Sequence, residues 1–541
     1  MSKNTISPWV PVIVALAFVA GIGSGIYMNR TTGRPAAEQK IGYIFDMIDA
    51  EYVDHVDLDS LVEKTLPSLL SNLDPHSVYI PAESLKAVNE DLDGSFSGVG
   101  ISFTIQNDTV TVIEVISGGP AEKVGVMAGD RIITIDGDPF TGSSIDNDRV
   151  MKTLRGEKGS TVTLGIKRNS SSKPLSYEVT RGDIPVTSID ASYMLSDDIG
   201  YVKVNKFGRT TYNEFYQAMN ELKRAGATDY VIDLRGNGGG YMEMAVLMAN
   251  EFLPRGSMIV YTRGRDGHNS QMNVADGSGS FQDAGVTVLL DEFSASASEI
   301  FAGAMQDNDR GVIIGRRSFG KGLVQTQTTL PDSSAIRLTI SRYYTPSGRC
   351  IQKDYSNLDE YNKDILNRYD HGEAFSVDSI KLDKSLIYNT IGGRTVYGGG
   401  GIMPDIFVPN DTTGITSYFL KVRNAGLFQK WAFEYADKHR DQLAACHSID
   451  ELLATLPSDY ALLDDFSNFA ARNGIPKQWY YIKQSSGLIV DNLKALIARD
   501  ALGIPGYYMI INRGDSTVDK AVDTLRDGCR ILDFETRPAE E

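Results

Sequence analysis

Apolar and polar residues alternate with different periods along the chain, and these periods divide it into regions. Between residues 38 and 90 the apolar residues repeat at i, i+3, i+4 and i+7, which predicts helices. The clearest such run is Ile41, Ile44, Phe45 and Ile48. From residue 94 the period becomes two, in short runs such as GVGISFTI and TVTVIEVI between glycine-rich turns. We therefore expect a helical region over 35–90 and a β-rich module over 91–182.

Beyond residue 184 strand and helix patterns alternate, which is typical of an α/β domain. TYNEFYQAMNELKRAG predicts a helix with a capping box of Thr211 and Glu214 that ends at Gly226. The strand DYVIDL leads through RGNGGG into the helix YMEMAVLMANEFL. The strand VTVLLD leads to a helix that begins near Ser296 or Ser298, and the strand VIIG leads to RRSFGKGLVQ. We expect this domain to span 183–410.

After Pro409 helical patterns return in FQKWAFEYADKHRDQL, IDELLATL and GLIVDNLKALIARDAL, whereas GYYMIINRG is typical of a strand. No chemistry can be assigned to this part of the sequence. We expect a mainly helical extension over 411–541 that packs on the preceding domain or mediates self-association into a homo-oligomer.

The N-terminal region contains a stretch of 21 residues without a charge, from Pro8 to Met28. At 1.5 Å per residue it can cross about 30 Å of hydrocarbon. A cleaved signal peptide is the alternative, but its apolar core is shorter and ends in small residues at an A-x-A type of site. We expect residues 1–34 to form a cytoplasmic stub and a transmembrane anchor. The rest of the chain would then be exported, to a bacterial periplasm or cell envelope.

Composition narrows the classes of protein. Hydrophobic residues make up 42% and charged residues 23% of the 541 positions, which excludes wholesale disorder and a polytopic membrane protein. The net charge of −17 would repel phosphate backbones, so nucleic acid is not an expected partner. Three distant cysteines, Cys350, Cys446 and Cys529, give neither a zinc site nor a disulfide framework. We expect no metal and no cofactor.

The glycine loop at 236–240 lies between a strand and a helix, as in dinucleotide-binding proteins. The pattern G-x-G-x-x-G from Gly236 would however need a glycine at 241, where the chain has Tyr241, so this interpretation weakens. A loop of exposed N–H groups at a helix N-terminus remains, and such a loop stabilises negative charge.

The chemistry of the two later loops is that of a serine nucleophile and a lysine base. Ser296 is the first residue of S-x-x-E, which is also a capping box, and Lys321 lies between two glycines, where a turn residue is the ordinary alternative. A serine hydroxyl needs a base, and an amine kept neutral by burial, here next to Phe319, can serve. His76 in LDPHSVYIP is more simply a residue of a hydrogen-bonded turn. The sequence has neither H-E-x-x-H nor G-x-S-x-G, which favours a Ser–Lys dyad.

Taken together, these motifs resemble those of the carboxyl-terminal processing, or tail-specific, serine peptidases. DLRGNGGG, FSASASEIFAGAMQDN, SFGKGLVQ, YYTPSGRCIQ and GGGGIMPDI occur in that family's order within about residues 38–410. The resemblance implies a Clp protease/crotonase-like core of strand–strand–helix units. It also implies the roles of five residues: Ser296 as nucleophile, Lys321 as general base, Gln325 as the residue that orients the lysine, and the N–H groups of Ala297 and Gly240, with Gly239 as second choice, as the oxyanion hole.

The β-rich module resembles a PDZ domain, a class that binds the C-terminal carboxylate of peptides. The segment Ser97, Gly98, Val99 and Gly100 would be the carboxylate-binding loop before the strand GISFTI. Consecutive amides in a glycine-rich turn form an anion nest, and the neighbouring strand edge can accept an extended peptide. We therefore expect a PDZ-containing endopeptidase for protein tails. An inactive relative that binds protein C-termini as a scaffold or chaperone is the alternative.

Overall fold

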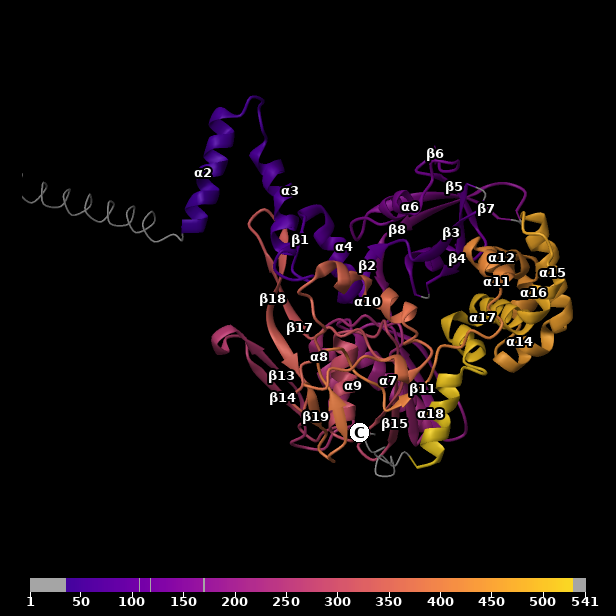
Figure 1. Ribbon diagram of the computed structural model, residues 1–541. Coiled ribbons are helices and arrows are strands. Elements are labelled where there is room, and N and C mark those ends of the chain that lie inside the picture. The colour runs from indigo at the N-terminus through magenta and orange to yellow at the C-terminus, as the bar shows by residue number, and fades with distance from the viewer. Residues whose placement is uncertain (1–35, 107, 117, 169–170, 529–541) are drawn as a thin grey trace, which may run out of the picture. The chain divides into compact units, whose positions relative to one another are not determined.

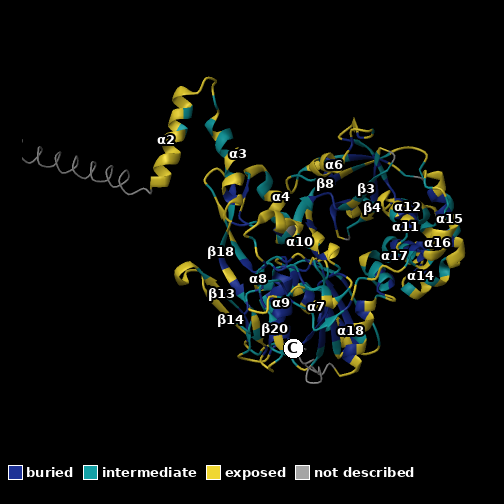
Figure 2. Ribbon diagram, in the orientation of Figure 1, coloured by how far each residue is buried: buried dark blue, intermediate teal, exposed yellow. Residues whose placement is uncertain are grey.

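The computed structural model describes residues 36–528 except 107, 117 and 169–170 (Figure 1). The chain forms two compact units, residues 1–81 and residues 82–541. In the part of the first unit that is described, two helices and one short strand follow each other. These are α2 (Ala36–Glu51), α3 (Leu58–Ser71) and β1 (Val78–Ile80). None of the residues of α2 is buried, and this helix is exposed over most of its surface (Figure 2).

The turn that contains His76 is held by an aspartate. The Asp74 carboxylate accepts hydrogen bonds from the N–H groups of His76 (2.8 Å) and Ser77 (2.9 Å), and from the Ser77 hydroxyl (2.6 Å). His76 is thus a turn residue through its backbone. This agrees with the structural interpretation of LDPHSVYIP.

The second unit begins with α4 (Ala82–Asp93) and the β-rich module. The module's sheet has the order β3-β4-β5-β7-β8 with antiparallel neighbours, and β3 is an edge strand. Its elements are β2 (Ser95–Gly98), β3 (Ile101–Gln106), β4 (Thr109–Val115), α5 (Pro120–Val124), β5 (Arg131–Ile135), β6 (Asp138–Pro139), α6 (Asn147–Leu154), β7 (Thr161–Lys167), β8 (Leu175–Thr180) and β9 (Gly182–Pro185). Inward-facing residues such as Val110, Ile132 and Leu164 form a core of its own.

The α/β domain is built on a sheet with the order β10-β11-β12-β15-β16-β21, in which β11 and all strands after it are parallel. Its elements are β10 (Ile189–Met194), β11 (Ile199–Val204), α7 (Thr211–Ala225), β12 (Asp229–Asp233), α8 (Met242–Asn250), β15 (Gly285–Leu290), α9 (Ala297–Asp307), β16 (Val312–Gly315) and β21 (Ile406–Phe407). Because side chains alternate along a strand, Tyr230 and Ile232 pack on α7–α9 while Val231 points to the opposite face.

A second, antiparallel sheet is formed by strands inserted between those of the first. Its strands are β13 (Met258–Gly264), β14 (Gln271–Val274), β17 (Leu323–Thr329) and β18 (Ala335–Tyr344), with β18 between β13 and β17. After β18 come α10 (Leu358–Asp370) and the hairpin of β19 (Ile387–Asn389) and β20 (Thr395–Tyr397). Two single 3₁₀ turns lie at Arg265–Gly267 and Val377–Ser379.

Helices make up the C-terminal region, as expected. They are α11 (Ser417–Asn424), α12 (Leu427–Lys438), α13 (Arg440–Ala444), α14 (Ile449–Thr455), α15 (Asp459–Arg472), α16 (Trp479–Gln484), α17 (Ser486–Ile511) and α18 (Ser516–Arg526). The segment GYYMIINRG is not a strand: most of it continues α17 after a kink at Gly503. The packing around the kink determines the structure of this segment: Gly506 lies so close to the Ala498 carbonyl that no side chain would fit between them.

Helix α18 covers the face of the large sheet that α7–α9 leave open (Figure 1). Val518, Ala521 and Leu525 of α18 are buried against strand residues, among them Val231 and Leu289. The last described helix is therefore part of the core that carries the α/β domain.

The N-terminus of helix α7 differs from the one predicted from the sequence. Helix α7 does end at Gly226, but its N-cap is Thr210, not Thr211; the Glu214 carboxylate accepts from the Thr210 hydroxyl and from the N–H groups of Ser188 and Ile189. The predicted capping box is therefore wrong, because Glu214 bonds Ser188 and Ile189 at the start of β10.

The apolar stretch 8–28 lies outside the described residues, and no described helix is long and apolar enough to cross a bilayer.

Candidate active site

The N-terminus of α9 presents one serine in an unusual conformation. Ser296 has φ 55° and ψ −112°, a region that only glycine adopts without strain, and it is partly exposed. Its neighbours Ser294 and Ser298 are fully buried, and their hydroxyls donate to the carbonyls of Leu234 and Asn237 (2.9 Å each). Of the three serines, only Ser296 is presented at the surface of this site.

The buried carboxylate of Glu299 joins the two predicted catalytic loops. Its Oε2 accepts from the N–H groups of Ser296 and Lys321 (2.8 Å each). Its Oε1 accepts from the Gly320 N–H (2.7 Å) and the Ser318 hydroxyl (2.5 Å). Burial raises the pKa of Glu299, although these hydrogen bonds act in the opposite direction. Glu299, which the sequence predicted only as the partner in a helix cap, therefore holds the backbones of Ser296 and Lys321 next to each other.

The glycine loop at 236–240 lies against the residues at the start of α9. The Asn237 carbonyl accepts from the Ala295 N–H (3.0 Å), and an added Cβ on Gly239 would stand 2.8 Å from the Ser296 Cβ. The Gly239 N–H is occupied, because it donates to Asn237 Oδ1 (2.8 Å). Among the described residues no acceptor is present for the N–H groups of Gly240 and Ala297. Of the two candidate glycines, Gly240 is the one with an N–H available to a ligand.

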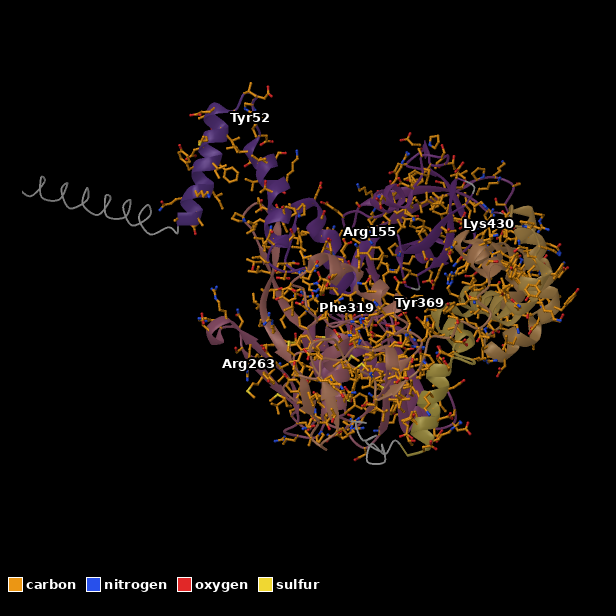
Figure 3. The ribbon with its side chains drawn as sticks, in the orientation of Figure 1. Tyr52, Arg155, Arg263, Phe319, Tyr369 and Lys430 are labelled. Carbon is orange, nitrogen blue, oxygen red and sulfur yellow. The ribbon has the colours of Figure 1, made fainter. Side chains whose placement is uncertain are left out.

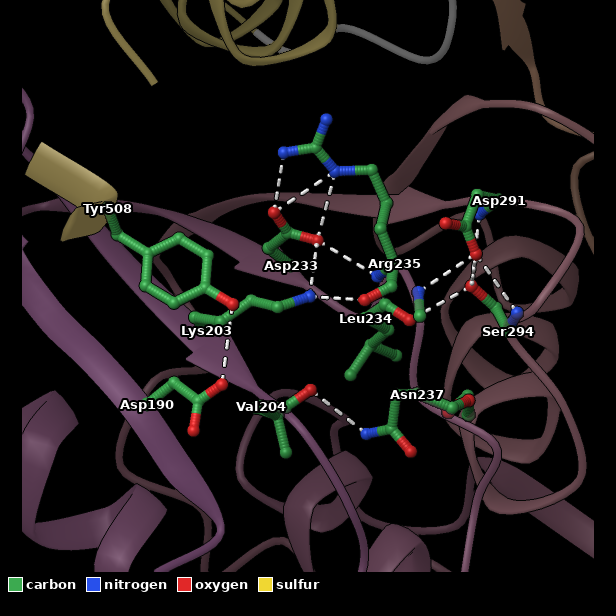
Figure 4. Close-up of polar contacts among 12 residues, drawn as sticks. Asp190, Lys203, Val204, Asp233, Leu234, Arg235, Asn237, Asp291, Ser294 and Tyr508 are labelled. Atoms are coloured by element: carbon green, nitrogen blue, oxygen red, sulfur yellow. Dashed lines mark hydrogen bonds and ion pairs between the residues drawn. The ribbon is translucent and has the colours of Figure 1, made fainter. Parts of the chain in front are cut away.

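Charged residues support the start of this loop (Figure 4). Asp233, at the end of β12, is buried and bonded to Lys203 and Arg235, at 3.3 Å and 2.7 Å. Burial alone would raise the pKa of Asp233, but these two cations outweigh it and hold the pKa below its usual range. Arg235 also pairs with Asp515, the N-cap of α18, at 2.8 Å. The C-terminal helix thus contacts the residue next to the glycine loop.

The lysine loop differs in part from expectation. Lys321 is half-buried, but the Phe319 ring lies against the ammonium of another lysine, Lys353, at 3.8 Å. The pairing of β17 with β18 shifts register just before Gln325. The side-chain amide of Gln325 donates to the Thr339 hydroxyl (3.2 Å). A role of Gln325 in orienting Lys321 stays a prediction.

The segment predicted to bind a carboxylate is only partly a loop. Ser97 and Gly98 belong to β2 and pair with Asp183 and Gly182 of β9; only Val99 and Gly100 form the turn into β3. The partner strand lies some 85 residues further along the chain, so the local pattern could not reveal it. The Ser97 hydroxyl is buried without a hydrogen-bond partner among the described residues.

Several residues of the site have functions that the sequence did not indicate. Tyr343 is fully buried, and its hydroxyl donates to the Ser296 carbonyl (3.2 Å), which holds the strained residue from behind. Asn237 and Asp515 act on the glycine loop as described above. A signal existed only for Glu299, in the motif S-x-x-E, and it pointed to a cap rather than to the lysine loop.

Three regions of the chain match models of known protein families. "Peptidase family S41" matches residues 198–360, "PDZ domain" matches 97–179, and "Family of unknown function (DUF8443)" matches 418–503. The "Carboxy-terminal-processing protease" of Bartonella bacilliformis is 39% identical over 318 residues, which are 58% of this chain and 72% of that protein. A "Probable CtpA-like serine protease" of Staphylococcus aureus (strain N315) is 30% identical over 455 residues, 81% of this chain and 89% of that protein.

Among solved structures, the "Photosystem II D1 C-terminal processing protease" is 26% identical, with a TM-score of 0.35, over 70% of this chain and 94% of that one. The family predicted from the motifs is confirmed by the sequence matches. The chain belongs to peptidase family S41, the carboxy-terminal processing serine proteases, with a PDZ domain ahead of the peptidase domain.

Proposed function

We propose that this chain is a serine endopeptidase in which Ser296 is the nucleophile and Lys321 the general base. The observation that carries the proposal is the Glu299 carboxylate, which binds the backbone N–H groups of both residues at 2.8 Å. Two loops that lie 25 positions apart in the sequence are thereby held at one place.

The chemistry follows from these groups. The neutral amine of Lys321 takes the proton of the Ser296 hydroxyl, and the oxygen attacks the carbonyl carbon of a peptide bond. The oxyanion that forms lies near the start of α9, where the free N–H groups of Ala297 and Gly240 can donate to it. The protonated amine then donates to the leaving nitrogen, and water hydrolyses the acyl-enzyme.

Degradation of an unstructured protein substrate tests this assignment. Ser296→Ala and Lys321→Ala should each lower turnover by several orders of magnitude, and the double variant should be little worse, because the pair acts as a unit. Lys321→Arg should also be inactive, since a guanidinium stays protonated. The rate of the wild type should rise with pH through one deprotonation. Near-normal activity of Lys321→Ala would remove it from the role of base.

The PDZ domain is proposed to bind the C-terminal tail of the substrate. Among the described strands β3 has a neighbour on one side only, so its other edge can pair with an extended peptide, and Val99 and Gly100 form the turn that leads into it. Charge-assisted hydrogen bonds to a terminal carboxylate contribute about 1.5–3 kcal/mol, or about 10- to 150-fold in affinity. Amidation of the substrate's C-terminus should therefore raise KM by about this factor. Equal cleavage of amidated and free substrates would exclude tail recognition.

Residues 1–34 are proposed to anchor the enzyme in a membrane with its catalytic body exported, because residues 8–28 carry no charge. Deleting residues 1–30 should release an enzyme that still cuts added substrates. Recovery of the full-length protein wholly in the soluble fraction, with a new N-terminus beyond residue 20, would identify a cleaved signal peptide instead.

A further inference from the structure

Residues 353–397, which include α10 and the hairpin β19–β20, separate the motif YYTPSGRCIQ from GGGGIMPDI. The match to peptidase family S41 ends at residue 360, near the start of α10. Side chains of this segment contact the lysine loop, which suggests a function in the reaction itself.

An arginine on α10 reaches the backbone just before Lys321. Arg368 is 93% buried, and its guanidinium donates to the carbonyls of Ser318 (2.8 Å) and Phe319 (3.2 Å). Asp364, one turn earlier on the helix, pairs with the same guanidinium at 2.9 Å. Figure 3 labels Phe319 and also Tyr369, which follows Arg368 on α10.

A buried lysine, Lys353, belongs to the same cluster. The Lys353 ammonium binds the Asp364 carboxylate (2.9 Å) and lies over the rings of Phe319 (3.8 Å) and Tyr361 (4.2 Å). Its backbone N–H donates to the Gly320 carbonyl (3.0 Å). A cation between two aromatic faces, fixed by a carboxylate, leaves Phe319 little freedom to move.

The loop 318–320 is therefore held on two flanks. Glu299 binds the Gly320 N–H and the Ser318 hydroxyl on one flank, and Arg368 and Lys353 bind the carbonyls and the Phe319 ring on the other. Without the second flank, the buried carbonyl of Ser318 would lose a charged donor, and the loop could rotate about its contacts with Glu299.

We propose that α10 is a positioning element for the catalytic lysine. Directly through Arg368, and through Asp364 and Tyr361, which hold Lys353, it fixes residues 318–320 and thereby the place of the Lys321 amine relative to Ser296. This inference rests on the proposed function, because it assumes that Lys321 is the base. Neither Arg368 nor Lys353 is assigned a contact with substrate; both are positioning residues.

Steady-state kinetics of the full-length chain test the proposal with four variants. Arg368→Met removes the donor to both carbonyls, and Arg368→Lys keeps one cationic donor. Lys353→Met keeps an apolar chain between the two rings but removes the charge. Lys363→Met is the matched control, an exposed residue of the same helix.

A displacement of about 1 Å at a reacting group can cost about 100-fold in rate. We therefore expect Arg368→Met to lower kcat about 100-fold with KM changed less than twofold, Arg368→Lys to recover at least tenfold of that loss, and Lys353→Met to lower kcat about tenfold. The Lys363→Met control should equal the wild type. Thermal unfolding of each variant gives the folded fraction by which kcat is corrected.

If kcat of Arg368→Met per folded enzyme equals that of the wild type, α10 only stabilises the fold and the proposal is overturned. Should Arg368→Met not fold, Lys353→Met decides: an unchanged kcat there also overturns it. A wild type that cuts no substrate, or a Ser296→Ala variant that does, would instead refute the proposed dyad.

Discussion

The backbone of Ser296 allows a test of stored strain that does not depend on any substrate. Ser296→Gly and Ser296→Ala both lack the hydroxyl, and both keep the N–H that binds Glu299 and the carbonyl that accepts from Tyr343. The two variants differ only in a methyl group. At φ 55° and ψ −112° that group makes the conformation costly, whereas glycine adopts it freely.

The size of the difference can be worked out from this geometry. A non-glycine residue in such a region costs about 1–3 kcal/mol. Glycine gives back about 0.4–1 kcal/mol, because it gains freedom in the unfolded chain. We expect Ser296→Gly to be more stable than Ser296→Ala by about 1–2 kcal/mol. In a domain of about 150–250 residues this raises Tm by about 2–8 °C.

Thermal and denaturant unfolding of the two variants, followed by the same optical probe, measure this difference. Ser298 supplies the control pair: it lies within α9, so Ser298→Gly should be less stable than Ser298→Ala by about 1 kcal/mol. If glycine at 296 is no more stable than alanine while the control pair behaves as expected, Ser296 is not strained and the argument from its dihedral angles fails.

Three further predictions follow from other parts of the structure. Gly239→Ala should lower kcat by about 100-fold or more, since the added carbon would stand 2.7 Å from the Ala295 carbonyl oxygen, next to the proposed nucleophile Ser296. Gly238→Ala, with no atom within 4 Å of the added carbon, should stay active in the same assay. Burial raises the pKa of Asp500 from 3.8 to about 6, so its contribution to stability is present below about pH 3.8 and lost as pH rises through 6. In denaturant unfolding, the free energy of unfolding of Asp500→Asn should exceed that of the wild type by up to about 3 kcal/mol at pH 8 and equal it below pH 4. Ending the chain at Gly514 should abolish cooperative unfolding of the peptidase domain, whereas ending it at Gly528 should not, because α18 lies between these points.

Local sequence patterns predicted most of the helices and strands of the α/β domain. Helix α7 stops at Gly226 because a glycine with positive φ satisfies its last carbonyls, a signal that needs no distant residue. The strand predicted at GYYMIINRG is wrong because most of this segment is the end of α17, where Tyr507 and Ile510 pack on the core of the C-terminal helices, and no local rule contains those contacts. Neighbouring residues determine the first kind of feature; the packing of the whole chain determines the second.

The same division holds for the site. The motifs predict roles for Ser296, Lys321 and the glycine loop, but contacts that hold these segments come from far away in the sequence. Arg235 and Asp515 are 280 positions apart, and their pairing depends on where α18 docks. The dual bonding of Glu299 could not be predicted either, because S-x-x-E already has a sufficient explanation as a cap.

The place of α18 has a consequence for how the enzyme is made. Translation proceeds from the N-terminus, so the segments with Ser296 and Lys321 emerge from the ribosome well before residues 516–526. Until those residues arrive, one face of the sheet that supports both loops lacks its apolar cover, and Arg235 lacks Asp515. A nascent chain therefore carries Ser296 and Lys321 before the sheet beneath their loops is covered. We expect the peptidase domain to become active only after α18 has been synthesised and has docked on this sheet.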